Sequence, residues 1–102
     1  MTEYNLPNDQ GPDVIFNGEQ LAAISSYRGN VPDRWTELVV YREEHGAYVV
    51  QSIGRSTWPN ERDKFRATVC ADEDAVLAEL GTGSLAKGIY DILGFDCVID
   101  LR

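Results

Sequence analysis

The first candidate for chemistry in this sequence is its one histidine. His45 stands between Glu44 and Gly46, in a polar break between two apolar segments, and this position predicts a solvated turn. A general base works when a pocket and an orienting partner hold it against its substrate, and a turn supplies neither. We therefore expect no catalytic role for His45, and we expect that the chain is not an enzyme.

The other motifs with chemical potential are incomplete. None of the five serines stands in the Gly-x-Ser-x-Gly setting of an activated nucleophile. The segment Gly81-Thr82-Gly83-Ser84 has glycines like those of a phosphate-binding loop but lacks its Lys-Ser/Thr pair, so a link between two helices explains it better. The acidic run Asp72-Glu73-Asp74 lacks the alternating ligands of a calcium loop.

The cysteines do not predict a metal site. Cys70 and Cys97 are far apart, no C-x-x-C spacing occurs, and a single histidine cannot complete a ligand set. Both cysteines lie in apolar stretches, which favours two buried thiols that behave as small hydrophobic side chains. We expect no metal and no cofactor.

Aromatic and arginine side chains are better candidates for binding. Trp58 stands in a predicted loop beside Pro59, with Arg55 and Arg62 close to it in the sequence. Tryptophan and arginine are among the residues that dominate protein interfaces. The sequence leaves two possibilities open for Trp58: exposure for binding, or packing against one end of the sheet.

The charge is uneven along the chain. The net charge is −8, with −4 in residues 1–27, +1 in residues 28–70 and −5 in residues 71–102. Few basic residues are available to replace the counterions of a phosphate backbone, so we expect no direct nucleic-acid binding. A protein with a basic surface is a more natural partner, although acidity also keeps a small domain soluble. The acidic candidates for such an interface are Asp72, Glu73, Asp74, Asp96 and Asp100.

The length of 102 residues fits a single domain. We expect it over residues 14–102, because residues 1–13 are polar, contain breakers and show no periodicity, as in a flexible tail. The start of the sequence has no basic or apolar region typical of a secretory signal, and no apolar run reaches the ~20 residues of a membrane helix. The expectation is a cytoplasmic protein without membrane contact, as a monomer or a homodimer.

The clearest structural pattern is a hairpin over residues 35–55. Two segments rich in Val, Tyr and Leu flank the break at residues 43–46. Apolar residues occur on both faces of the first segment, which predicts a central strand. A four-residue loop would pair Tyr41 with Tyr48, and a three-residue loop would pair Val40 with Val50. The sequence leaves both registers open, and also a two-residue turn at His45-Gly46.

A second hairpin is predicted at Asn17-Gly18, the residue pair that a type I′ turn favours, with a return strand over residues 19–26. A short helix over the same return segment is the alternative, because Asn17 and Gln20 have the spacing of a capping box.

The C-terminal half predicts a strand over residues 65–70 and two short helices. The first helix begins at Asp72 and ends at Gly81; Ser84 caps the second, which ends at Gly94. A last strand over residues 95–101 has an acidic outer face. The predicted fold is α+β: a mostly antiparallel sheet of about five or six strands, with helices on one face.

In size, acidity and lack of catalytic motifs, the chain resembles the small acidic proteins of phages and mobile elements, such as the anti-CRISPR proteins. The resemblance implies a non-enzymatic protein that inhibits or masks a larger partner, of the kind that handles nucleic acid. The alternative function is binding of a nucleotide-like small molecule at the loop around Trp58.

Overall fold

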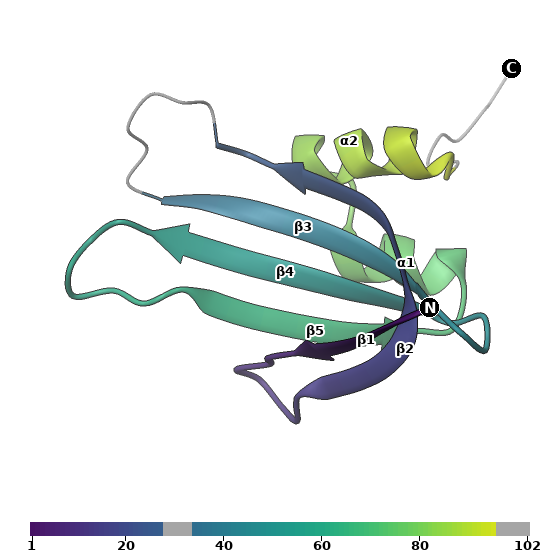
Figure 1. Cartoon of the computed structure of the whole chain (residues 1–102). Helices are drawn as coiled ribbons and strands as arrows, with labels where there is room; N and C mark the ends of the chain where they lie inside the picture. Colours follow the sequence, from purple (N-terminus) through teal and green to yellow (C-terminus); the bar gives the residue numbers. More distant parts are fainter. Residues whose placement is uncertain (28–33, 96–102) are drawn as a thin grey trace, which may run out of the picture.

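The computed structural model describes residues 1–27 and 34–95 and confirms the α+β class. The elements are β1 (Thr2–Leu6), β2 (Val14–Ser25), β3 (Arg34–Glu43), β4 (Tyr48–Ser56), β5 (Lys64–Cys70), α1 (Glu73–Leu80) and α2 (Ser84–Leu93). The strands form one antiparallel sheet in chain order, with β3 at its centre as predicted. The sheet curls into a half-barrel, and both helices lie against the same face of it (Figure 1).

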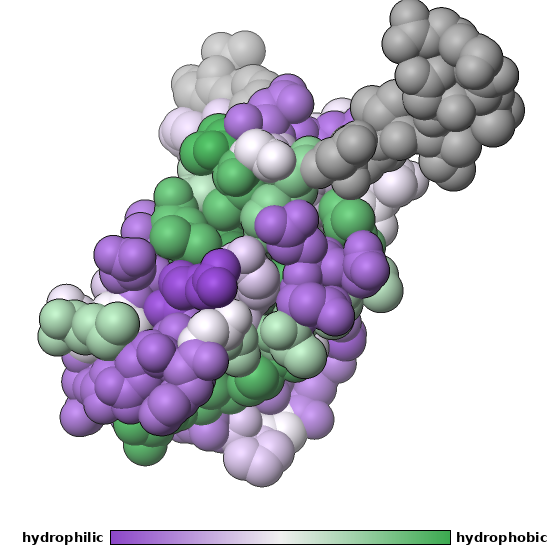
Figure 2. Space-filling model, turned by 90° about the vertical axis from the view of Figure 1, so that its right-hand side faces the viewer, coloured by the Kyte–Doolittle hydropathy of each residue, from purple (hydrophilic) through white to green (hydrophobic). Residues whose placement is uncertain are grey.

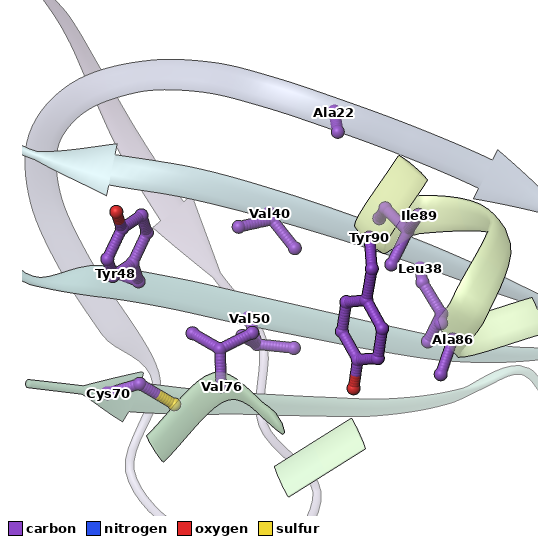
Figure 3. Close-up of a cluster of buried hydrophobic side chains, with 10 residues drawn as sticks. All are labelled: Ala22, Leu38, Val40, Tyr48, Val50, Cys70, Val76, Ala86, Ile89 and Tyr90. Carbon is purple, nitrogen blue, oxygen red and sulfur yellow. The ribbon is translucent and has the colours of Figure 1, made fainter. Parts of the chain in front are cut away.

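The first part of the core lies between the sheet and the helices (Figure 3). Its buried residues are Ala22, Leu38, Val40, Tyr48, Val50, Cys70, Val76, Ala86, Ile89 and Tyr90. Val40, Val76, Ile89 and Tyr90 are completely buried. Each buried side chain of this size stabilises the fold by roughly 1.5–3 kcal/mol, so this cluster fixes the helices on the sheet.

The second part of the core fills the inside of the half-barrel. It contains Leu6, Phe16, Tyr41, Val49 and Ala67. The rings of Tyr4 and Phe16 flank that of Tyr41, with centroid distances of 4.6 and 5.4 Å. Burial, and to a smaller degree Tyr4, raises the pKa of the Tyr41 hydroxyl, which bonds Gln51 Oε1 at 3.2 Å. The middle of β3 is thus buried on both faces, as its sequence predicts.

The N-terminal residues belong to the sheet, which corrects the expectation of a flexible tail over residues 1–13. β1 pairs with β2 from Thr2 opposite Gly18 to Leu6 opposite Val14. Tyr4 and Leu6 face the core, while Glu3 and Asn5 face water. The strand is too short and polar to be recognised from its pattern, because its stability comes from these tertiary contacts.

The segment after β1 then binds the outer edge of β5. Asp9 N donates to Phe65 O, and Phe65 N donates to Asp9 Oδ2, both at 2.8 Å. Asn8 Nδ2 donates to Ala67 O at 3.1 Å. We call Asn8 and Asp9 the N-terminal clasp, because they connect the first part of the curled sheet to its last strand.

The predicted hairpin at Asn17-Gly18 is wrong, and so is the helical alternative for residues 19–26. Both residues lie inside β2, which runs without a turn from Val14 to Ser25. Gly18 serves a different purpose there. A Cβ atom at this position would lie 2.1 Å from Arg42 O, so glycine permits the close approach of β2 to β3.

The central hairpin has the three-residue loop. Val40 pairs with Val50 and Arg42 with Tyr48, and Glu43 N donates to Ala47 O at 2.8 Å. Gly46 takes a φ of 99°, a left-handed conformation that a side chain would strain. The strand pairing therefore shows which of the alternatives that the sequence leaves open is adopted.

The helix ends follow the predicted signals with one exception. Asp72 caps α1 and accepts a hydrogen bond from Ala75 N at 2.8 Å, and Gly81 and Gly94 end the two helices. Gly83, and not Ser84, is the N-cap of α2. The predicted last strand lies outside the described residues except for Phe95, which is not in a strand. Neither described helix has the length and apolar character needed to cross a membrane.

Candidate functional site

The antiparallel strands place two different grooves at opposite ends of the sheet (Figure 1). The start of β1, the β3–β4 turn and the end of β5 lie at one end. The start of β3 and the β4–β5 loop lie at the other. The grooves differ in charge, which makes each a candidate site for a different class of ligand.

The first groove, which we call the acidic mouth, has a volume of about 380 Å³. Its lining consists of Glu3, Val14, Ile15, Phe16, Asn17, Glu43, Glu44, His45, Val49 and Val69. Ile15 and Val69 are 65% and 60% exposed, so apolar surface is open to solvent there. Among the described lining residues three are glutamates and none is a lysine or an arginine. Seen from this end of the molecule, hydrophilic residues surround smaller hydrophobic patches (Figure 2).

Backbone pairing brings the glutamates of the acidic mouth together. Glu44 N donates to Asn17 O at 2.9 Å, which attaches the β3–β4 turn to β2. Glu3 lies opposite the same Asn17 on the other side of β2. Glu3 and Glu44, which are 41 positions apart in the sequence, therefore lie on either side of Asn17.

His45 lies on the turn at the edge of this groove, as predicted. Its side chain is 82% exposed, and its Nδ1 lies 2.8 Å from Glu43 Oε1. Glu43 Oε1 also accepts a hydrogen bond from the His45 backbone N–H, so the carboxylate closes the turn. This arrangement positions the turn and leaves the imidazole in water.

The second groove, the basic groove, has a volume of about 370 Å³. Its lining consists of Ser26, Arg34, Trp35, Thr36, Gly54, Arg55, Ser56, Glu61, Arg62 and Lys64. Four of the nine basic residues of the chain line it. Four carboxylates lie beside them, on Asp9, Glu37, Glu61 and Asp63, so the charge at this groove is balanced in a protein of net charge −8.

Ion pairs shape the wall of the basic groove. Arg55 donates to Asp63 Oδ2 at 2.7 Å and to Glu37 Oε1 at 3.1 Å, above the ring of Phe65. The hydrogen bond from Arg55, together with one from Ser56 N, lowers the pKa of Asp63. Arg55 is therefore fixed by its neighbours and is a weak candidate for a free interface residue.

A second pair lies on the rim of the basic groove. Arg34 donates to Glu61 through Nε and Nη2, both at 2.9 Å, and Ser56 Oγ donates to Glu61 Oε1 at 2.7 Å. These bonds, that from Arg34 first, lower the pKa of Glu61. The pair is exposed, with 66% of the Arg34 side chain and 38% of the Glu61 side chain open to solvent.

The structure separates the candidate residues chosen from the sequence. Arg55 and Arg62 line the basic groove, and Trp58, in the loop beside it, is 50% exposed and belongs to neither core cluster. Asp72 caps α1, and Glu73 and Asp74 are exposed in its first turn, at the opposite end of the sheet. Asp96 and Asp100 lie outside the described residues.

Sequence reasoning did not identify Arg34 and Lys64, or Glu3, Ile15 and Val69. Arg34 and Glu61 are 27 positions apart and meet only in this strand register. Glu3 joins the acidic mouth only because β1 is part of the sheet. No sequence signal distinguishes Ile15 and Val69, because each stands in a strand among other apolar residues and only the structure shows them exposed.

The described cysteine and the acidic residues do not form a metal site. Cys70 is buried, and burial raises the pKa of its thiol, with smaller contributions from Glu79 and Asp72. Within residues 1–27 and 34–95, no group of three or more His, Cys, Asp or Glu side chains is arranged to hold a metal ion. Cys97 lies outside these ranges.

A comparison with known protein families found no match for this chain, and comparisons with curated proteins and with solved structures found none either.

Proposed function

We propose that this chain is a non-enzymatic interaction protein that binds a larger partner through the acidic mouth and thereby inhibits or masks it. The partner presents a basic surface, of the kind found on proteins that handle nucleic acid. The observation that carries the proposal is the combination in one groove of exposed apolar side chains, Ile15 and Val69, with three glutamates and, among the described lining residues, no lysine or arginine.

The chemistry of the acidic mouth favours a segment of the partner with alternating apolar and basic side chains. Ile15 and Val69 offer apolar surface that a partner side chain removes from water. Glu3 and Glu44 are exposed at the rim and attract a lysine or an arginine, which has an apolar stem of its own. The net charge of −8 adds a long-range attraction that accelerates association with a basic partner.

The test compares two variants with the same change in net charge. The mouth variant carries Glu3→Lys and Glu44→Lys; the control carries Glu19→Lys and Asp91→Lys, at exposed positions that do not line the acidic mouth. Each protein is immobilised and exposed to bacterial lysate at low salt. A partner captured in stoichiometric amount is then purified, and its complex with each variant is measured by size-exclusion chromatography with light scattering.

The expected result is a complex with the natural protein and with the control, and at least tenfold weaker binding of the same partner by the mouth variant. Binding should also weaken as ionic strength rises, because the rim charges are exposed. Equal binding by both variants, or no stoichiometric partner at low salt, contradicts the proposal.

A further inference from the structure

We infer that the basic groove is a second, independent site, which binds a small ligand that carries a phosphate group and a flat ring, as a nucleotide does. This inference does not depend on the acidic mouth, which lies at the other end of the sheet.

The positive charges of the basic groove are compensated unevenly. Glu37 and Asp63 hold Arg55, and Glu61 pairs with Arg34. Arg62 is 82% exposed, and its nearest carboxylate oxygen, on Asp9, is 3.7 Å away. Lys64 is exposed and has no ion pair within 4.0 Å among the described residues. Arg62 and Lys64 therefore remain available to a dianionic phosphate.

Arg34 adds a contact that a phosphate can take over. Its guanidinium binds Glu61 with two parallel hydrogen bonds, a geometry that suits a phosphate equally well. Because both side chains are substantially exposed, the exchange of Glu61 for a phosphate does not disturb the core. Glu61 thus holds Arg34 in position while the basic groove is empty.

Trp35 supplies the surface for a ring. Its indole Nε1 donates to Glu37 Oε2 at 3.0 Å, and Tyr27 packs edge-on against it with a centroid distance of 5.0 Å. These contacts fix the indole where it lines the basic groove. Stacking on an aromatic side chain stabilises a bound base in proteins that bind single-stranded nucleic acid.

The size of the basic groove agrees with such a ligand. Its volume of about 370 Å³ is within the range of ~300–1,000 Å³ typical of small-molecule sites. A polymer is disfavoured, because a phosphate backbone would extend past the groove over a protein that is acidic elsewhere. The ligand is therefore a single nucleotide or a similar phosphorylated ring compound.

The experiment is isothermal titration calorimetry of the full chain with four probes: AMP, ADP, adenosine and inorganic phosphate. We expect saturable binding of AMP or ADP at least tenfold tighter than that of adenosine or phosphate. Arg62→Gln and Lys64→Gln should each weaken nucleotide binding about fivefold or more and reduce its dependence on salt. Lys87→Gln, at an exposed position on α2, is the matched control and should bind as the natural protein does.

The following results overturn the inference. If no probe binds at millimolar concentration, or if Arg62→Gln and Lys64→Gln bind as well as Lys87→Gln does, the basic groove is not a phosphate site. If phosphate binds as tightly as AMP, the role of Trp35 is wrong. Circular dichroism of each variant verifies that it is folded, and the mouth variant should bind nucleotide normally.

Discussion

Arg55 and Asp63 form a close ion pair at the basic end of the molecule, with 2.7 Å between Arg55 Nη1 and Asp63 Oδ2. The same guanidinium contacts Glu37 from its other side, at 3.1 Å. One side chain on β4 thereby connects β3 to the β4–β5 loop. This relationship gives Arg55 a structural role, where its sequence position suggests an interface residue.

Replacement of Arg55 by methionine should lower the free energy of unfolding by about 1 kcal/mol or less. Methionine keeps an apolar stem but leaves Glu37 and Asp63 without their shared cation, and partial exposure of the three groups limits the effect. Urea denaturation measures the change. Arg62→Met is the control, since Arg62 is 82% exposed; an equally large effect there would contradict the role of Arg55.

The difference between the natural protein and Arg55→Met should disappear in acid. Arg55 holds the pKa of Asp63 below its usual value of 3.8. A carboxylate with a lowered pKa in the folded state stabilises the protein fully above its unfolded pKa, and the stabilisation is lost as pH falls through the folded value. Denaturation at pH 7, 5 and 3 should show the same gap in unfolding free energy at pH 7 and 5 and a smaller gap at pH 3. A gap that widens in acid would contradict this assignment.

Gly18→Ala should destabilise the protein by about 2 kcal/mol or more. Its Cβ would stand 2.1 Å from Arg42 O, so the backbone of β2 or β3 must move. Gly54→Ala is the matched control in a strand, because its Cβ would meet Lys64 Cβ at 3.7 Å and Lys64 O at 4.0 Å, both ordinary contacts. Thermal unfolding of both variants measures the contrast, and similar melting temperatures would show that Gly18 is not at a close approach.

Asp9→Ala should lower the free energy of unfolding by about 1 kcal/mol. The change removes the acceptor for Phe65 N, at 2.8 Å, while the backbone bond from Asp9 N to Phe65 O remains possible. Hydrogen exchange should be faster at the Phe65 amide. Asp91→Ala removes an exposed acid from α2 and should leave this amide unchanged.

The fold class and the central hairpin were predictable because their signals are local. Alternating Val and Tyr residues predict β3 and β4. Asp72 predicts the start of α1, and Gly81 and Gly94 predict the ends of the two helices. The register was not predictable until the conformation of Gly46 was known.

The N-terminal half was not predictable for a different reason. Asn17-Gly18 has the composition of a turn. In the structure Gly18 instead permits the close approach of Arg42 O, so tertiary packing overrides the local turn preference. β1 is a short polar segment whose buried residues, Tyr4 and Leu6, gain stability only when the half-barrel is present.

The candidate sites were predictable only in part. The concentration of bases around Trp58 indicated the basic groove, because Arg55 and Arg62 are close in sequence. Arg34 joins them through strand pairing across the sheet, and the acidic mouth depends on β1. Both grooves combine residues from distant segments, and composition contains no information about which segments meet.

The N-terminal clasp has a consequence for the order in which the protein assembles. Asp9 and its partner Phe65 are 56 positions apart, so β1 leaves the ribosome long before the strand edge that the clasp binds. The β3–β4 hairpin has short-range contacts and is free to form in the interval. Closure of the half-barrel is therefore a late step of biogenesis, and until β5 is synthesised the inner apolar surface has no complete cover.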